Sequence, residues 1–144
     1  MSDLDKTVAL LEKVPLFAGL KKRQLMTLTR IFIERKCDPG EVIVPQGRDG
    51  YGFFIITSGA AEAILERADG TKVVVNTFKA PDFFGELSLL DGGPRTATVL
   101  ATEECQCLIL PRENFLGAMR RDGEMAVAIM EELAKRFRHA LATL

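Results

Sequence analysis

One stretch near the middle of the chain combines residue types that suit the binding of a phosphate group. Phe84 is followed by Gly85 and then by good helix formers from Glu86 to Leu90, so a short helix is predicted to start directly after a glycine. The free N–H groups and the positive dipole end of such a helix attract anions, and a glycine lets backbone approach a ligand closely. These residues predict an anion site that holds its ligand and contains no nucleophile.

A cation is expected to face the same site from the strand that follows. Residues 91–94 (DGGP) stop the helix and turn the chain, so that Arg95 enters a strand predicted over 95–101. The planar guanidinium of an arginine can bind two phosphate oxygens at once. Glu86 would repel a phosphate, and it fits such a site mainly as an acceptor of hydrogen bonds from sugar hydroxyls. Phosphate donors beside a hydroxyl acceptor indicate a nucleotide ligand.

Residues 84–99, FGELSLLDGGPRTATV, resemble the phosphate-binding cassette of the cyclic nucleotide-binding domain family. That family includes the catabolite activator protein, the regulatory subunits of cyclic-nucleotide-dependent kinases and cyclic-nucleotide-gated channels. The resemblance covers roughly residues 8–140 and includes 15–17 (PLF), 39–43 (PGEVI), Gly47 and 58–59 (SG). It implies an eight-stranded β-roll of the jelly-roll type whose ligand is cyclic AMP or cyclic GMP.

The resemblance also implies a role for individual residues of this segment. Gly85 and Leu87 would offer backbone N–H groups, and Glu86 would bind the ribose 2′-hydroxyl. Arg95 would pair with the cyclic phosphate. Thr96 would contact the phosphate or the base, and a hydroxyl at this position is associated in the family with tolerance of cyclic GMP, so both nucleotides are expected to bind. The predicted ligand-binding residues are Phe84, Gly85, Glu86, Leu87, Ser88, Arg95, Thr96 and Ala97.

The last predicted helix has two expected roles. Apolar residues recur along it at alternating steps of four and three, which is the spacing of a coiled-coil seam: Ala126, Met130, Leu133, Phe137, Ala140 and Leu144. We expect a homodimer through this seam, and the alternative is that the stripe packs on the β-roll. The family resemblance implies that the same helix covers the bound base, with Arg136, Phe137 and Arg138 as lid residues.

Short β-rich runs between turn signals predict a mainly β body over residues 31–111, with helices on both sides, in one domain spanning 1–144. The predicted strands are 31–37, 42–44, 52–58, 60–66, 72–79, 95–101 and 104–110. Asp69 and Gly70 predict a tight hairpin turn between two of them. A helical hairpin is expected within residues 1–30, from helices over 5–11 and 21–29. The C-terminal part, 112–144, is expected to contain helices over 112–120 and 124–142, with a break at 122–123.

Composition excludes several classes of partner and location. The net charge of −1 and the pI of about 5.9 provide no basic field for nucleic acid or for an anionic membrane. No signal peptide or membrane-spanning apolar stretch is evident, so a cytoplasmic protein is expected. Reduced, buried thiols are the favoured interpretation of the three cysteines, although a metal site of Cys105, Cys107 and His139 is the alternative.

None of the common catalytic or nucleotide-hydrolysing motifs occurs in the sequence, so no enzyme activity, metal or cofactor is expected. Relatives that regulate transcription carry a helix-turn-helix after the last helix, whereas the last residue of this sequence is Leu144, so no DNA binding is expected. The sequence therefore predicts a stand-alone, non-catalytic sensor that signals through movement of its C-terminal helices to an unknown effector protein. The alternative is a β-roll interaction module that no longer uses a nucleotide.

Overall fold

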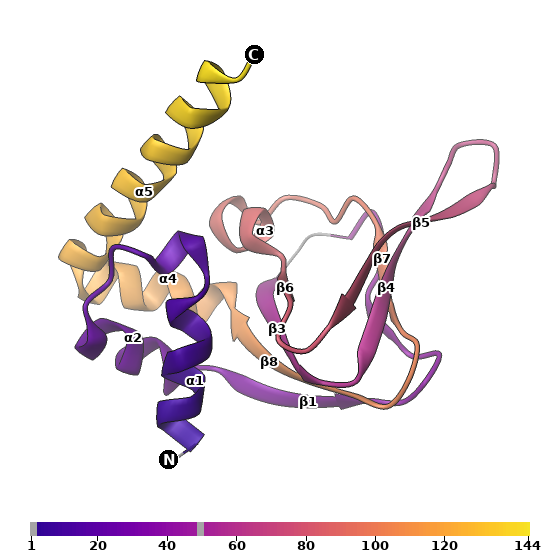
Figure 1. Cartoon of the computed structure of the whole chain (residues 1–144), viewed down its shortest axis with the longest axis horizontal. Coiled ribbons are helices and arrows are strands. Elements are labelled where there is room, and N and C mark those ends of the chain that lie inside the picture. The colour runs from indigo at the N-terminus through magenta and orange to yellow at the C-terminus, as the bar shows by residue number, and fades with distance from the viewer. Residues whose placement is uncertain (1–2, 49–50) are drawn as a thin grey trace. The chain divides into compact units, whose positions relative to one another are not determined.

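The computed structural model describes residues 3–48 and 51–144 (Figure 1). The described chain forms two compact units. One, the helical unit, contains residues 3–31 and 114–144, and the other, the roll unit, contains residues 32–113. Within the described residues, no helix is both long enough and apolar enough to cross a membrane.

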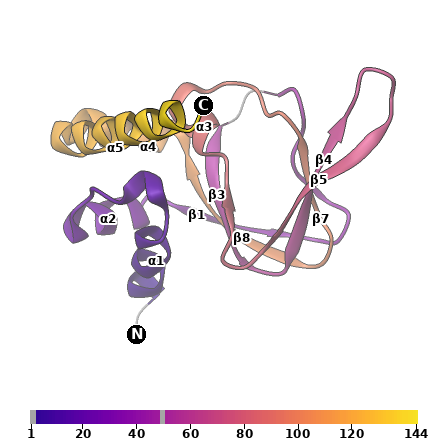
Figure 2. The same cartoon turned by 45° about the horizontal axis from the view of Figure 1, so that its top comes forward.

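The roll unit consists of two four-stranded antiparallel sheets, whose curvature is clearest in Figure 2. The first sheet has the order β1 (Ile33–Cys37), β8 (Cys105–Pro111), β3 (Gly52–Ser58) and β6 (Phe83–Phe84). The second has the order β2 (Val42–Val44), β7 (Thr98–Ala101), β4 (Ala60–Glu66) and β5 (Lys72–Lys79). This confirms the predicted β-roll of the jelly-roll type with flanking helices.

The core of the roll is an apolar cluster to which both sheets contribute. Phe54 stacks on Phe84 with 4.9 Å between ring centroids, and Phe78 lies 5.1 Å from Phe84. The three cysteines, Cys37, Cys105 and Cys107, are free thiols buried in this cluster, as the sequence predicted. Burial raises the pKa of each thiol, and that of Cys107 rises to about 12. Thiols with such pKa values stay protonated and behave as small apolar side chains.

The strand predicted over 95–101 is wrong in its first half, because β7 begins only at Thr98. The backbone of Arg95 pairs instead with a loop, since its N–H donates to the carbonyl of Arg48 and its carbonyl accepts from the N–H of Gly47. Residues 96 and 97 then form a bend. Arg95 therefore lies in a loop before the sheet, where loop–loop hydrogen bonds hold it.

Two further details of the roll differ from the sequence prediction. Strand β6 was missed, because its two residues are too few to show an alternating pattern. The β4–β5 turn is longer than expected, since Arg67 N–H donates to Thr71 O across a three-residue loop. Gly70 adopts the left-handed conformation there (φ 87°), and the Asp69 carboxylate accepts hydrogen bonds from Thr71. This geometry is typical of the three-residue hairpin loop that ends in a glycine bulge.

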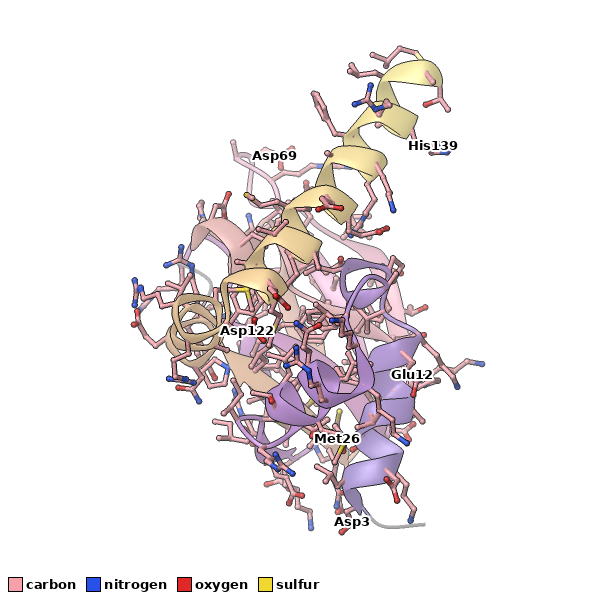
Figure 3. All side chains as sticks on the ribbon, turned by 90° about the vertical axis from the view of Figure 1, so that its left-hand side faces the viewer. Asp3, Glu12, Met26, Asp69, Asp122 and His139 are labelled. Carbon is pink, nitrogen blue, oxygen red and sulfur yellow. The ribbon has the colours of Figure 1, made fainter. Side chains whose placement is uncertain are left out.

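The helices are α1 (Asp3–Glu12), a 3₁₀ turn (Pro15–Phe17), α2 (Lys22–Thr29), α4 (Arg112–Arg121) and α5 (Gly123–Ala142). Helices α1 and α2 form the predicted N-terminal hairpin. The break before α5 is a single residue, because Gly123 is already helical and Asp122, labelled in Figure 3, is the N-cap. The Asp122 carboxylate accepts hydrogen bonds from Met125 N–H and from the amide of Gln24 on α2, and the first of these lowers its pKa.

Candidate functional site

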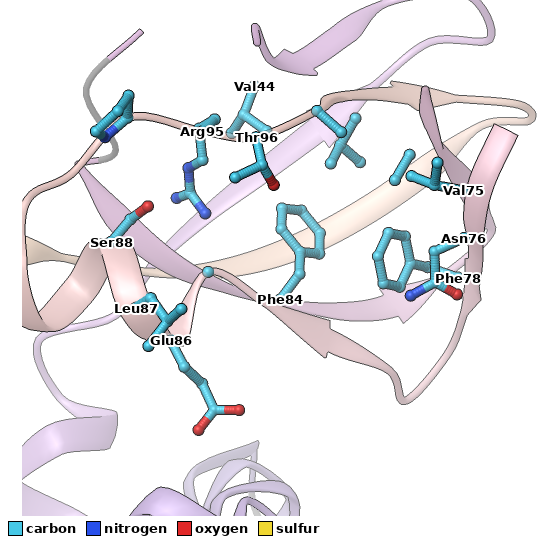
Figure 4. A pocket seen from close by; sticks show the side chains of 15 residues that line it. Val44, Val75, Asn76, Phe78, Phe84, Glu86, Leu87, Ser88, Arg95 and Thr96 are labelled. Atoms are coloured by element: carbon cyan, nitrogen blue, oxygen red, sulfur yellow. The ribbon is translucent and has the colours of Figure 1, made fainter. Parts of the chain in front are cut away.

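A pocket of about 420 Å³ lies in the roll unit, in the size range of small-molecule sites (Figure 4). One part of its wall comes from the loop before β7 and from helix α3 (Glu86–Asp91), and the other part comes from the second sheet. All eight residues that the sequence predicted as ligand-binding line this pocket: Phe84, Gly85, Glu86, Leu87, Ser88, Arg95, Thr96 and Ala97. The fold thus brings the two halves of the predicted cassette to one cavity.

Gly85 is the N-cap of α3 and has a φ of 95°, a conformation that residues with a side chain rarely adopt. A Cβ atom at this position would lie 2.5 Å from Nη1 of Arg95 and 2.7 Å from the carbonyl oxygen of Gly52. The glycine is therefore needed for two reasons, its backbone conformation and the passage of the Arg95 side chain across the start of α3.

Arg95 is the central residue of the site and is only 8% exposed. Its guanidinium donates a short hydrogen bond to the carbonyl oxygen of Gly52 and lies 5.4 Å from the centroid of the Phe54 ring. Burial lowers the pKa of this guanidinium. Among the described residues no carboxylate forms an ion pair with Arg95, and its Nε atom has no hydrogen-bond partner. A buried cation without a counter-charge is costly, so this position is suited to receive an anion.

The polar side chains around Arg95 differ in their hydrogen bonds and in the direction in which they point. The Ser88 hydroxyl is buried and donates to the carbonyl of Gly93 at 3.2 Å, which ties the turn after α3 to the helix. Figure 4 shows the Thr96 hydroxyl beside the Arg95 guanidinium, whereas the Glu86 carboxylate extends away from it. A phosphate bound at Arg95 would therefore be kept apart from the charge of Glu86.

The apolar part of the wall was not identified from the sequence. Val44, Ala63 and Val99 come from three strands of the second sheet and are each at most 6% exposed. Alternating apolar residues within each strand indicate an inward face, but they do not indicate which strands are neighbours. Asn76 on β5 was also missed, and nothing in its sequence context distinguishes it from an exposed strand residue.

The three predicted lid residues, Arg136, Phe137 and Arg138, lie on α5 in the helical unit, where all three are exposed. Their lid role stays a prediction. Residues 3–48 and 51–144 contain no group of three or more His, Cys, Asp or Glu side chains that could hold a metal ion.

Comparisons of this chain with a family profile and with known protein sequences point to the same family. The sequence profile of the cyclic nucleotide-binding domain matches residues 34–122. The chain is 38% identical over 107 residues to a cAMP-dependent protein kinase regulatory subunit of Emericella nidulans, covering 74% of this chain and 25% of that protein. It is 32% identical over 126 residues to the cyclic AMP receptor protein of Thermus thermophilus, covering 88% of this chain and 58% of the receptor. The chain thus spans about a quarter and somewhat over half of these two relatives.

A solved structure shows the same architecture over most of its length. The N-terminal domain of a transcriptional regulator from Streptomyces coelicolor superposes with a TM-score of 0.84 at 29% sequence identity, covering 91% of this chain and 94% of that domain. A match over this share of the chain extends beyond the roll, so the similarity includes flanking helices as well.

Proposed function

The chain belongs to the cyclic nucleotide-binding domain family, and we propose that it is a non-catalytic sensor that binds cyclic AMP or cyclic GMP in the pocket around Arg95. The observation that carries this proposal is the buried guanidinium without a counter-charge among the described residues. A cyclic phosphate supplies that charge. The names of the kinase regulatory subunit and of the receptor protein, both of which refer to cyclic AMP, support the choice of ligand class.

Each part of the pocket has a task in this proposal. Arg95 binds the phosphate oxygens, and the N–H groups of Gly85 and Leu87 add donors beside it. Glu86 accepts a hydrogen bond from the ribose 2′-hydroxyl. Thr96 contacts the phosphate or the base, and the apolar wall of the second sheet covers the faces of the purine.

Arg112 provides a route by which the ligand state reaches the C-terminal helices. It is the first residue of α4, and its Nη2 atom donates to the carbonyl of Leu90 at 3.2 Å, near the end of α3. Its backbone N–H also donates to the carbonyl of Tyr51. A ligand that moves α3 would change these contacts and so bias the position of α4 and α5. The homodimer through α5 and the lid residues belong to the same proposal, and an effector protein would respond to the shifted helices.

Thermal unfolding with added nucleotide tests the binding step. Cyclic AMP and cyclic GMP should raise the melting temperature of the full chain. At a hundredfold excess of ligand over the dissociation constant, binding adds about 2.7 kcal/mol to the free energy of unfolding. Non-cyclic 5′-AMP and 5′-GMP are the matched controls and should have a much smaller effect. A folded protein whose melting temperature is unchanged by either cyclic nucleotide would contradict the proposal and favour a role through protein contacts alone.

A further inference from the structure

Four pocket residues form one row across the second sheet, one from each strand. Val99 on β7 pairs with Val44 on β2 and with Ala63 on β4, and Ala63 pairs in turn with Asn76 on β5. Side chains at directly paired positions lie on the same face of a sheet. The first three members are buried and apolar, whereas Asn76 is exposed and stands on the edge strand. The row therefore ends in a single amide at the rim of an apolar wall.

A β-bulge is what directs Asn76 to the pocket. Ile64 pairs with Val74, whereas Ala63 pairs with Asn76, so Val75 is an extra residue in β5. With a continuous register Val75 would stand opposite Ala63, and Asn76 would face the other side of the sheet. Because of the bulge, both Val75 and Asn76 line the pocket. Figure 4 shows Asn76 at the end of the cavity opposite to Arg95.

The orientation of the Asn76 amide follows from its own hydrogen bond. Its Oδ1 atom accepts the backbone N–H of Thr77 at 2.9 Å. Since a backbone N–H can only donate, the atom that faces it must be the amide oxygen. The Nδ2 group is left to donate, and Figure 4 shows this nitrogen on the side of the pocket where Phe84 and Arg95 lie. Asn76 thus presents a hydrogen-bond donor to whatever occupies the far end of the cavity.

We propose that Asn76 reads the edge of the bound purine and favours a 6-oxopurine, an inference that rests on the proposed function. Guanine and hypoxanthine carry two acceptors side by side, O6 and N7, which match the Nδ2 donor. Adenine carries an amino donor at the 6-position, and its usual pairing with an asparagine uses both the amide oxygen and the amide nitrogen. The oxygen of Asn76 is turned toward the backbone N–H of Thr77, so the nitrogen is the atom that faces the cavity. Cyclic GMP and cyclic IMP should therefore bind more tightly than cyclic AMP.

Cyclic IMP separates this role from that of Thr96. A threonine beside the phosphate arginine can contact the 2-amino group of guanine, which hypoxanthine lacks, whereas both bases carry O6. If Asn76 sets the preference, cyclic IMP should resemble cyclic GMP in affinity. If Thr96 alone sets it, cyclic IMP should resemble cyclic AMP, which would overturn the inference.

Titration calorimetry of the full chain with the three cyclic nucleotides tests the proposal. Asn76→Asp replaces the donor by an acceptor of the same shape, so affinity for cyclic GMP and cyclic IMP should fall roughly tenfold or more relative to that for cyclic AMP. Thr77→Asp is the matched control, because it adds the same charge on the opposite face of β5 and should leave the ratio unchanged.

Two further results would overturn the assignment of Asn76. One is a parent protein that binds cyclic AMP more tightly than both 6-oxopurine nucleotides, and the other is an Asn76→Asp variant with an unchanged ratio of affinities. A failure of the proposed function looks different, because the parent protein would then bind none of the three nucleotides.

Discussion

Arg95→Met should separate ligand binding from folding more cleanly than any other change in the pocket. Methionine keeps most of the volume of the side chain and removes its charge. A desolvated charge pair between a protein and its ligand contributes about 2–5 kcal/mol to binding, and each 1.4 kcal/mol is tenfold, so affinity for a cyclic nucleotide should fall by roughly thirtyfold to several thousandfold.

The effect on stability without ligand is the sum of opposing contributions. The variant loses the cation–π contact with Phe54, about 1 kcal/mol, and a charged hydrogen bond to the Gly52 carbonyl, about 1.5–3 kcal/mol. It also avoids the desolvation of a buried cation that has no counter-charge among residues 3–48 and 51–144, which costs several kcal/mol. We therefore expect the free energy of unfolding of the ligand-free protein to fall by no more than about 1 kcal/mol.

Titration calorimetry and urea unfolding of the same preparations measure both quantities. Arg95→Lys is the informative comparison, because it keeps the charge but cannot bind two phosphate oxygens in the same plane, so its affinity should be intermediate. Near-parental affinity of Arg95→Met would refute the placement of the phosphate at Arg95. A large loss of stability with unchanged affinity would show instead that Arg95 is a structural residue.

The other predictions concern the backbone at Gly85, the ribose contact of Glu86, the thiol of Cys107 and the helix α5. Gly85→Ala should destabilise the protein more than Gly70→Ala in urea unfolding. An alanine at either position must adopt a positive φ, which costs about 1–2 kcal/mol, but of the two only the new Cβ at residue 85 meets other atoms. Equal losses would contradict the close approach of Arg95. Glu86→Gln should weaken binding of ribose nucleotides and hardly affect their 2′-deoxy analogues in calorimetry, and parallel losses would exclude the ribose role. The pKa of Cys107 is raised from 9.0 to about 12, so the folded state keeps a proton that the unfolded chain releases near pH 9. The free energy of unfolding should therefore fall above pH 9, by up to about 1.4 kcal/mol per pH unit. Cys107→Ala should flatten this decline in unfolding curves measured at several pH values, and a decline of the same slope would disprove the assignment. Phe137→Glu should yield monomers in light scattering if α5 forms the dimer seam, since Phe137 is 68% exposed, and a parent protein that is already monomeric at high concentration would rule the seam out.

The placement of the α5 seam illustrates the limit of a periodic pattern. The stripe of Ala126, Met130 and Phe137 was predicted from spacing alone, and the residues that α5 buries are two others, Met125 and Ile129. Helical periodicity indicates that an apolar face exists, but it does not indicate whether that face packs within the chain or contacts a partner. The homodimer itself stays a prediction.

Local chemistry is what the sequence by itself determined. The helix after Gly85, the turn that follows this helix and the proposal that Arg95 binds a phosphate depend on residue types within 16 consecutive positions, where propensity and motif spacing are informative. The β-roll followed from strand and turn signals together with the family resemblance. The helix and the turn are set by neighbours along the chain, so they can be inferred without knowledge of the fold.

Only the tertiary structure decided how distant strands share one pocket. The pairing of Val44, Val99 and Ala63 across the second sheet depends on strand order, and the exposure of Asn76 to the cavity depends on one extra residue in β5. A bulge shifts every side chain beyond it to the other face, and its position reflects pairing with a partner strand that no local pattern specifies. The absence of a counter-charge for Arg95 among the described residues is likewise a property of the packed fold, because it depends on which side chains the fold places around the guanidinium.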